Sequence, residues 1–128
     1  MNLSVIHNFL SDSYWSKNLP LETMKKAFNN SLCFGVLNKQ DKQIGFARVI
    51  TDKATFAYLA DVFILDEYQR QGISKLLMKA ILDHPDLQGL RRMMLATRDA
   101  HGLYRQFGFK SLANPDIFME LWDQNVYR

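Results

Sequence analysis

Apolar residues recur at helical spacing in four parts of the chain. Two short helices are predicted before residue 30, one around residues 5–10 and one after Pro20. A longer helix is predicted from residue 73 to the His84-Pro85 step, because its apolar side chains form a stripe along one side. A last helix is predicted from about Asp99 to Phe107, with Gly108 as a left-handed cap. The stripe of the longer helix consists of Ile73, Leu76, Leu77, Ala80 and Ile81.

Apolar runs rich in β-branched and aromatic residues predict strands between these helices. Three runs are separated by short polar turns, which favours antiparallel neighbours. A further strand is predicted at Arg92–Thr97, parallel to the third run because a helix joins the two. Ile117–Trp122 is predicted as a final strand. The pattern therefore predicts an α/β fold, a mixed sheet flanked by helices. The first three runs are Leu32–Leu37, Gln43–Ile50 and Thr55–Leu65.

Composition supports one folded domain over residues 1–128. The 128 residues are 48% hydrophobic and 12% aromatic, which excludes intrinsic disorder, and no repeat or linker divides them. The net charge of +3 is too small and too scattered for a nucleic-acid platform. The single cysteine, Cys33, excludes an internal disulfide and a cysteine-built metal site. With no apolar run of membrane-spanning length and no export signal, we expect a cytoplasmic protein with no membrane partner.

The segment Asp61–Leu77 carries the clearest chemical signal. It reads as an apolar strand, a polar turn with a glycine, and a helix whose first turn has no acidic side chain. The backbone N–H groups at such a helix start bind phosphate well. Gly72 lets a ligand approach the backbone, the turn Gln69-Arg70-Gln71 adds donors, and Lys75 adds charge. By spacing alone, a plain strand–turn–helix would look similar.

The same residues resemble the acyl-coenzyme A signature of the GCN5-related N-acetyltransferases (GNAT). In that family a hydrophobic strand leads into Gln/Arg-x-x-Gly-x-Gly/Ala, which is Gln69-Arg70-Gln71-Gly72-Ile73-Ser74 here. Downstream, Ala100–Phe109 is similar to the second signature of the family, with Tyr104 ahead of Gly108-Phe109. The chain departs from the family at Ser74, which replaces Gly or Ala, and at Thr97, which replaces a frequent Asn. The strand that opens the family fold is short or absent.

The resemblance implies the GNAT fold, with a mostly antiparallel sheet and one splayed pair of parallel strands. It also implies acetyl-coenzyme A (acetyl-CoA) as cosubstrate, without a metal, and transfer of the acetyl group by direct attack of an amine in a ternary complex. The acceptor would be a primary amine of a small molecule or peptide. Residues expected to contact the cofactor are Val62, Phe63, Ile64, Gln69, Arg70, Gln71, Gly72, Ile73, Ser74, Lys75, Thr97 and Tyr104.

Two residues are expected to act in catalysis. By its motif position Tyr104 protonates the leaving thiolate, although a tyrosine there also suits a core position. Asp61 interrupts an apolar strand on the same face as Leu59 and Phe63, and burial would raise its pKa toward that of a useful base. The alternative for Asp61 is a structural carboxylate bonded nearby.

The sequence indicates the residues of the acceptor pocket less clearly than those of the cofactor site. Tyr14 and Trp15 lie where relatives form one wall of the amine site, and Arg48 and Tyr58 point from neighbouring strands; ordinary packing is the alternative for each. His101 is either part of a proton relay or a surface residue. At the level of function, the alternatives are a non-catalytic acyl-CoA sensor and an acetyltransferase for a macromolecular amine. The apolar segment Ile117–Trp122 could pair across a homodimer.

Overall fold

The computed structural model describes residues 1–13 and 15–127 and divides the chain into two compact units. The first unit runs from Met1 to Ala96, and the second begins at Thr97. The first contains the whole sheet and most of the helical residues. That residues 1–128 act as one domain stays a prediction.

The sheet has four strands in the order β1-β2-β3-β4. Strands β1, β2 and β3 are antiparallel neighbours, and β4 pairs with β3 in parallel. The predicted mixed α/β fold is therefore confirmed, with ends that differ from the predicted runs by no more than two residues. The strands are β1 (Leu32–Leu37), β2 (Gln43–Thr51), β3 (Phe56–Ile64) and β4 (Arg92–Leu95).

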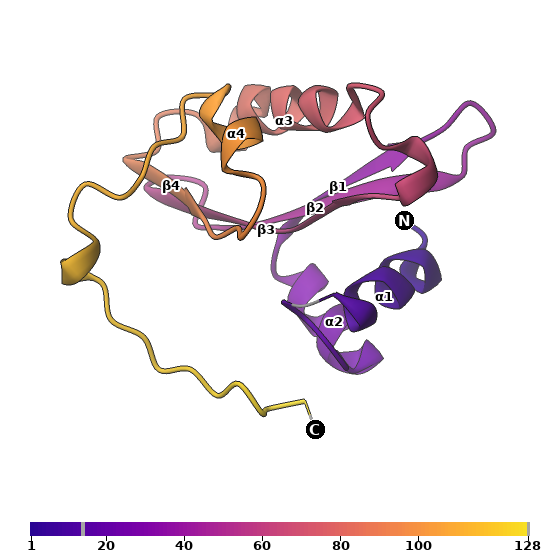
Figure 1. Ribbon diagram of the computed structural model, residues 1–128, viewed down its shortest axis with the longest axis horizontal. Helices are drawn as coiled ribbons and strands as arrows, with labels where there is room; N and C mark the ends of the chain where they lie inside the picture. Colours follow the sequence, from indigo (N-terminus) through magenta and orange to yellow (C-terminus); the bar gives the residue numbers. More distant parts are fainter. Residues whose placement is uncertain (14, 128) are drawn as a thin grey trace. The chain divides into compact units, whose positions relative to one another are not determined.

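Helices cover both faces of this sheet. Helices α1 (Leu3–Asp12) and α2 (Leu21–Asn29) lie on one face, and α3 (Ile73–Asp83) lies on the other (Figure 1). Stacked rings join the first two helices to the strands: Phe9 lies 4.1 Å from Phe63, and Phe28 lies 4.8 Å from Phe46, centroid to centroid. The core is thus formed where apolar helix stripes meet the strands. Its fully buried side chains include Ile6, Leu10, Met24, Phe46, Val49, Met78 and Ile81.

One side of the α3 stripe is not covered. Leu77 and Ile81 are buried as predicted, but Leu76 is 69% exposed and Ala80 is also exposed. The stripe is wider than the sheet surface it packs on, because β1 is the edge strand and no further strand continues the sheet among the described residues.

The second unit begins with a short helix, α4 (His101–Arg105). This helix is shorter than the predicted span, and the Thr97 hydroxyl accepts a hydrogen bond from the Ala100 N–H (3.1 Å) just before it starts. Gly108 has a φ of 92°, so the predicted left-handed conformation after the helix is confirmed.

The predicted strand Ile117–Trp122 is wrong. A 3-10 turn covers Pro115–Ile117, and the residues after it adopt no strand. Met119 is 96% exposed, and Trp122 is 73% exposed. An apolar run forms a strand only when a neighbouring strand satisfies its backbone groups, and no described strand pairs with this segment.

Candidate active site

Strand β3 pairs with its parallel neighbour β4 over only the first half of its length. Its parallel pairing with β4 runs from Phe56 opposite Arg92 to Leu59 opposite Leu95 and ends there. Residues 60–64 keep β2 on one side, but no strand among the described residues lies on the other. The main chain of Val62, Phe63 and Ile64, expected to contact the cofactor, therefore borders the gap where the parallel pair separates.

A β-bulge lies at the start of this stretch. Phe46 pairs with Phe63 and Arg48 with Ala60, so Asp61 and Val62 together lie opposite the single residue between Phe46 and Arg48 on β2. Asp61 has a φ of 56°, a left-handed conformation that aspartate tolerates better than most residues. Such bulges bend a strand and redirect its side chains.

The turn after β3 leads into an uncapped helix start. Gly72 precedes α3 with a φ of 78°, no side chain of the described residues caps the helix, and its first turn contains no acidic residue. A Cβ added at Gly72 would meet no atom of residues 1–13 or 15–127 within 4 Å, so the described structure leaves the space above this backbone open. Arg70, which also has a positive φ (65°), and Lys75 are exposed beside it. Open N–H groups, the positive end of the helix dipole and two cations together suit a phosphate or pyrophosphate.

The two glutamines of the turn have structural partners. The Gln69 amide donates to the Ile64 carbonyl (3.0 Å) and to the Asp66 carboxylate (3.2 Å). The Gln71 amide donates to the Glu67 carbonyl (3.4 Å). These bonds shape the loop between β3 and α3. Ile73 and Ser74 begin α3 and are half-buried.

Asp61 is the centre of a buried polar cluster. Its Oδ1 accepts a hydrogen bond from the Trp15 indole N–H (2.9 Å), and its Oδ2 accepts one from Arg48 Nε (2.8 Å). The side chains of Arg48 and Asp61 are only 16% and 7% exposed. Arg48 Nη1 also donates to the Ser31 hydroxyl (3.1 Å). These contacts agree with the structural alternative for Asp61, while its role as a base stays a prediction.

The described residues of the predicted acceptor wall lie on one face of the sheet. Tyr58 pairs with Ile50, two positions along β2 from Arg48, so the two side chains lie on the same face. Trp15 reaches Asp61 from the segment between α1 and α2 on that side, while Tyr14 lies outside the described residues. The structure thus brings Trp15, Arg48, Tyr58 and Asp61 to one face.

The other two predicted site residues belong to the second unit. Tyr104, in α4, is 8% exposed, and its ring meets that of Phe109 edge-on at 5.8 Å and 71°. Thr97 is the first residue of this unit, and its hydroxyl accepts a hydrogen bond from the Ala100 N–H. The exposed His101 is the first residue of α4.

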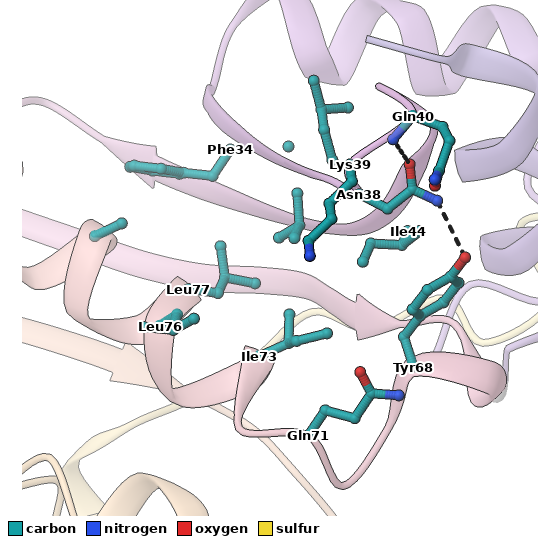
Figure 2. Close-up of a pocket in the computed structure, with 14 residues that line it drawn as sticks. Phe34, Asn38, Lys39, Gln40, Ile44, Tyr68, Gln71, Ile73, Leu76 and Leu77 are labelled. Atoms are coloured by element: carbon teal, nitrogen blue, oxygen red, sulfur yellow. Dashed lines mark hydrogen bonds between the residues drawn. The ribbon is translucent and has the colours of Figure 1, made fainter.

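An apolar groove of about 660 Å³ was not predicted from the sequence. It runs between β1 and α3, with Asn38 and Tyr68 joined by a 3.1 Å hydrogen bond at one end (Figure 2). The exposed Leu76 lines it, which explains why part of the α3 stripe is uncovered. No sequence signal marked it, because the edge position of β1 follows only from strand order. Its lining includes Phe34, Val36, Ile44, Gln71, Ile73, Leu76 and Leu77.

The residues that the structure describes contain neither a membrane-spanning helix nor a cluster of metal-binding side chains. No helix there is long and apolar enough to cross a membrane. In the same residues, His, Cys, Asp and Glu side chains form no group of three or more that could hold a metal ion.

Known proteins share both the sequence pattern and the fold. The model of the acetyltransferase (GNAT) family matches residues 3–109. A Gibberella zeae protein named as an acetyltransferase is 33% identical in an alignment of 118 residues. The match covers 76% of this chain and 66% of the relative, slightly less than two thirds of its length. A Xanthomonas campestris crystal structure, described as belonging to the GNAT family, is 49% identical with a TM-score of 0.95, covering 99% of this chain and 89% of that one.

A more distant structure shows the same fold. A GNAT family acetyltransferase from Elizabethkingia anophelis, solved with acetyl-CoA bound, is 16% identical with a TM-score of 0.63, over 89% of this chain and 78% of that one. The family match spans both signatures that the sequence resemblance rested on, including the glycine turn and Tyr104. The chain therefore belongs to the acetyltransferase (GNAT) family.

Proposed function

We propose that the protein transfers an acetyl group from acetyl-CoA to a primary amine of a small molecule or peptide, by direct attack in a ternary complex. One observation carries this proposal: β3 loses its parallel neighbour after Leu59 and then leads into an uncapped helix start at Gly72. A strand edge followed by an anion site suits an extended ligand that ends in phosphates. Family membership and the acetyl-CoA bound in the Elizabethkingia relative support acetyl-CoA as the ligand of that shape.

The chain would bind the two parts of this cosubstrate differently. The N–H groups at Gly72, Ile73 and Ser74 would hold the pyrophosphate, with Arg70 and Lys75 adding positive charge. The backbone of residues 62–64 would pair with the amide-containing arm as a strand does. Most of the recognition then comes from main-chain atoms, so replacing Val62 or Ile64 by another β-branched residue should be nearly silent.

The reaction requires proton movement at two places. An alkylamine with a pKa of about 10.4 is neutral only about once in 10³ molecules at pH 7, so a base or a water chain must take its proton. A backbone N–H of residues 62–64 would stabilise negative charge on the thioester oxygen. Tyr104 would give its proton to the leaving thiolate. In this proposal the reaction occurs in the cytoplasm and needs no metal.

The decisive experiment measures thiol release from acetyl-CoA with a panel of polyamines, aminoglycosides, amino acids and peptide N-termini. Amine-dependent release, with acetylated product identified by mass spectrometry, is the expected result. Acetyl-CoA binding is measured in parallel by thermal shift, because a ligand that binds only the folded state raises the melting temperature. Stabilisation without turnover on any amine would favour the sensor alternative, and the absence of both would refute the proposal.

A further inference from the structure

Both oxygens of the Asp61 carboxylate already accept a hydrogen bond. One accepts the Trp15 indole N–H and the other the Arg48 guanidinium, and the side chain is 7% exposed. A general base needs an oxygen within reach of the substrate proton, directly or through one water. A carboxylate whose oxygens both accept strong donors is better suited to holding those donors in place.

We propose that Asp61 is a positioning residue, which holds the Trp15 indole and the Arg48 guanidinium in a fixed arrangement on the acceptor side of the sheet, and that it does not take the proton from the amine. This inference rests on the proposed function, because it assigns Trp15 to the acceptor site. We call the three residues Trp15, Arg48 and Asp61 the indole clamp.

Trp15 is the part of the clamp that meets solvent. Its N–H is bound to Asp61, yet the residue is 41% exposed. Its ring also lies 6.2 Å from that of Phe9, which in turn stacks on Phe63 of β3. An indole held at its polar edge by Asp61 presents its exposed surface in one orientation. Indole faces attract ammonium groups, and the proposed acceptor is an amine that is protonated in solution.

The clamp is connected to the cofactor strand through the backbone. Asp61 is the left-handed residue of the bulge, and Val62 follows it at once on the stretch proposed to bind the cosubstrate. On the other side, Arg48 bonds Ser31, whose hydroxyl donates to the Ala27 carbonyl at the end of α2 (2.8 Å). The position of the indole is therefore set relative to the same residues that would hold the thioester.

The test compares Trp15→Phe and Asp61→Asn with Asp83→Asn, a control that removes the exposed carboxylate paired with Lys79 on α3. With the best amine from the panel, both clamp variants should raise the KM for the amine about 3–10-fold, the scale of one ordinary hydrogen bond, because the clamp acts on the amine only through the position of the indole. The kcat, the KM for acetyl-CoA and the pH dependence of kcat should stay near those of the wild type. The double variant should be little worse than Asp61→Asn alone, since both changes break one unit.

The opposite pattern would overturn the inference. If Asp61→Asn lowers kcat about 10²-fold or more and displaces the pH profile while Trp15→Phe changes nothing, Asp61 is the base. If Asp61→Asn fails to fold, the KM of Trp15→Phe decides, because that variant keeps an aromatic ring and an unchanged KM refutes the clamp.

Hydrogen exchange of the indole N–H groups tests the clamp without any activity. The chain has two tryptophans, and the second, Trp122, is 73% exposed. In NMR spectra of the whole protein, the Trp15 indole proton should exchange at least about 10-fold more slowly than that of Trp122, assigned with Trp122→Phe. Equal rates would refute the clamp. Failure to acetylate any amine would instead refute the proposed function, so the two failures are distinguishable.

Discussion

Replacing Gly72 by alanine tests the proposed phosphate site at a position where steric fit is not the difficulty. Gly72 has a φ of 78°, and a Cβ there would meet no atom of the described residues within 4 Å. The fold therefore loses stability only through backbone strain, about 1–2 kcal/mol for a non-glycine residue in the left-handed region. For a chain of this size that lowers the melting temperature by about 3–8 °C.

The substitution should weaken acetyl-CoA binding more than it destabilises the fold. The new methyl group would occupy the open space through which a phosphate approaches the α3 N–H groups. Loss of one charge-assisted hydrogen bond costs about 1.5–3 kcal/mol, which raises the Kd for acetyl-CoA about 10- to 100-fold. Isothermal titration calorimetry measures the Kd, and a thermal melt measures stability.

Gly89 provides a matched control for this variant. It has a φ of 71°, and its Cβ would also meet no atom of the described residues within 4 Å. Gly89 lies just before β4, near the Phe56–Arg92 end of the parallel pairing and not near the Leu59–Leu95 end where the strands separate. Gly89→Ala should lose similar stability but keep the wild-type Kd. If Gly72→Ala binds acetyl-CoA as tightly as Gly89→Ala does, the phosphate does not lie over Gly72 and the reasoning fails.

Three other changes test separate parts of the proposal. Tyr104→Phe keeps the buried ring and should lower kcat about 10²-fold at an unchanged Kd for acetyl-CoA; an unchanged kcat in the thiol-release assay would remove Tyr104 as the acid. Gln in place of both Arg70 and Lys75 should raise that Kd about 10-fold and reduce its dependence on salt, which titrations at 0.05 and 0.5 M NaCl would reveal. Hydrogen bonds from Thr55, first of all from its hydroxyl, hold the pKa of Asp52 well below its ordinary value, so this stabilisation is present above about pH 4 and disappears as the pH falls through the lowered pKa. In denaturant titrations, Asp52→Asn should therefore be less stable than the wild type at pH 7, with a difference that shrinks at pH 2; a constant difference would contradict this.

The sequence predicted most elements because each has a periodic apolar face that packs locally. α3 and β2 began where expected, since the glycine turn and the short polar loops set their ends. The strand expected at Ile117–Trp122 was wrong because a strand depends on a partner, and pairing is a property of the whole sheet. The exposure of Leu76 was missed for the same reason: helical spacing shows which side is apolar, but strand order decides how much of it is covered.

The sequence predicted which residues belong to the candidate site, but it predicted little of how they are arranged. The motif located the turn at Gly72 and placed Asp61 in the strand before it. It did not reveal the bulge, although an aspartate within an apolar strand is a signal for one, because aspartate is unfavourable in regular strands and tolerates a left-handed backbone. The contact of Asp61 with Trp15 spans 46 positions of sequence, so only the folded chain could show it.

The early end of the β3–β4 pairing also affects how the sheet would respond to a bound ligand. Residues 56–59 have strands on both sides, whereas residues 60–64 depend on β2 alone. This half of β3 therefore has backbone groups on one side that no described strand pairs with, which lowers the free energy needed to open it locally. A ligand that pairs with it would take the place of the absent strand, so the energy of binding would also rigidify the sheet. Without ligand, residues 60–64 would then pair with β2 alone. In each catalytic cycle the bound ligand would pair with their free side, and this pairing would be lost when the product leaves.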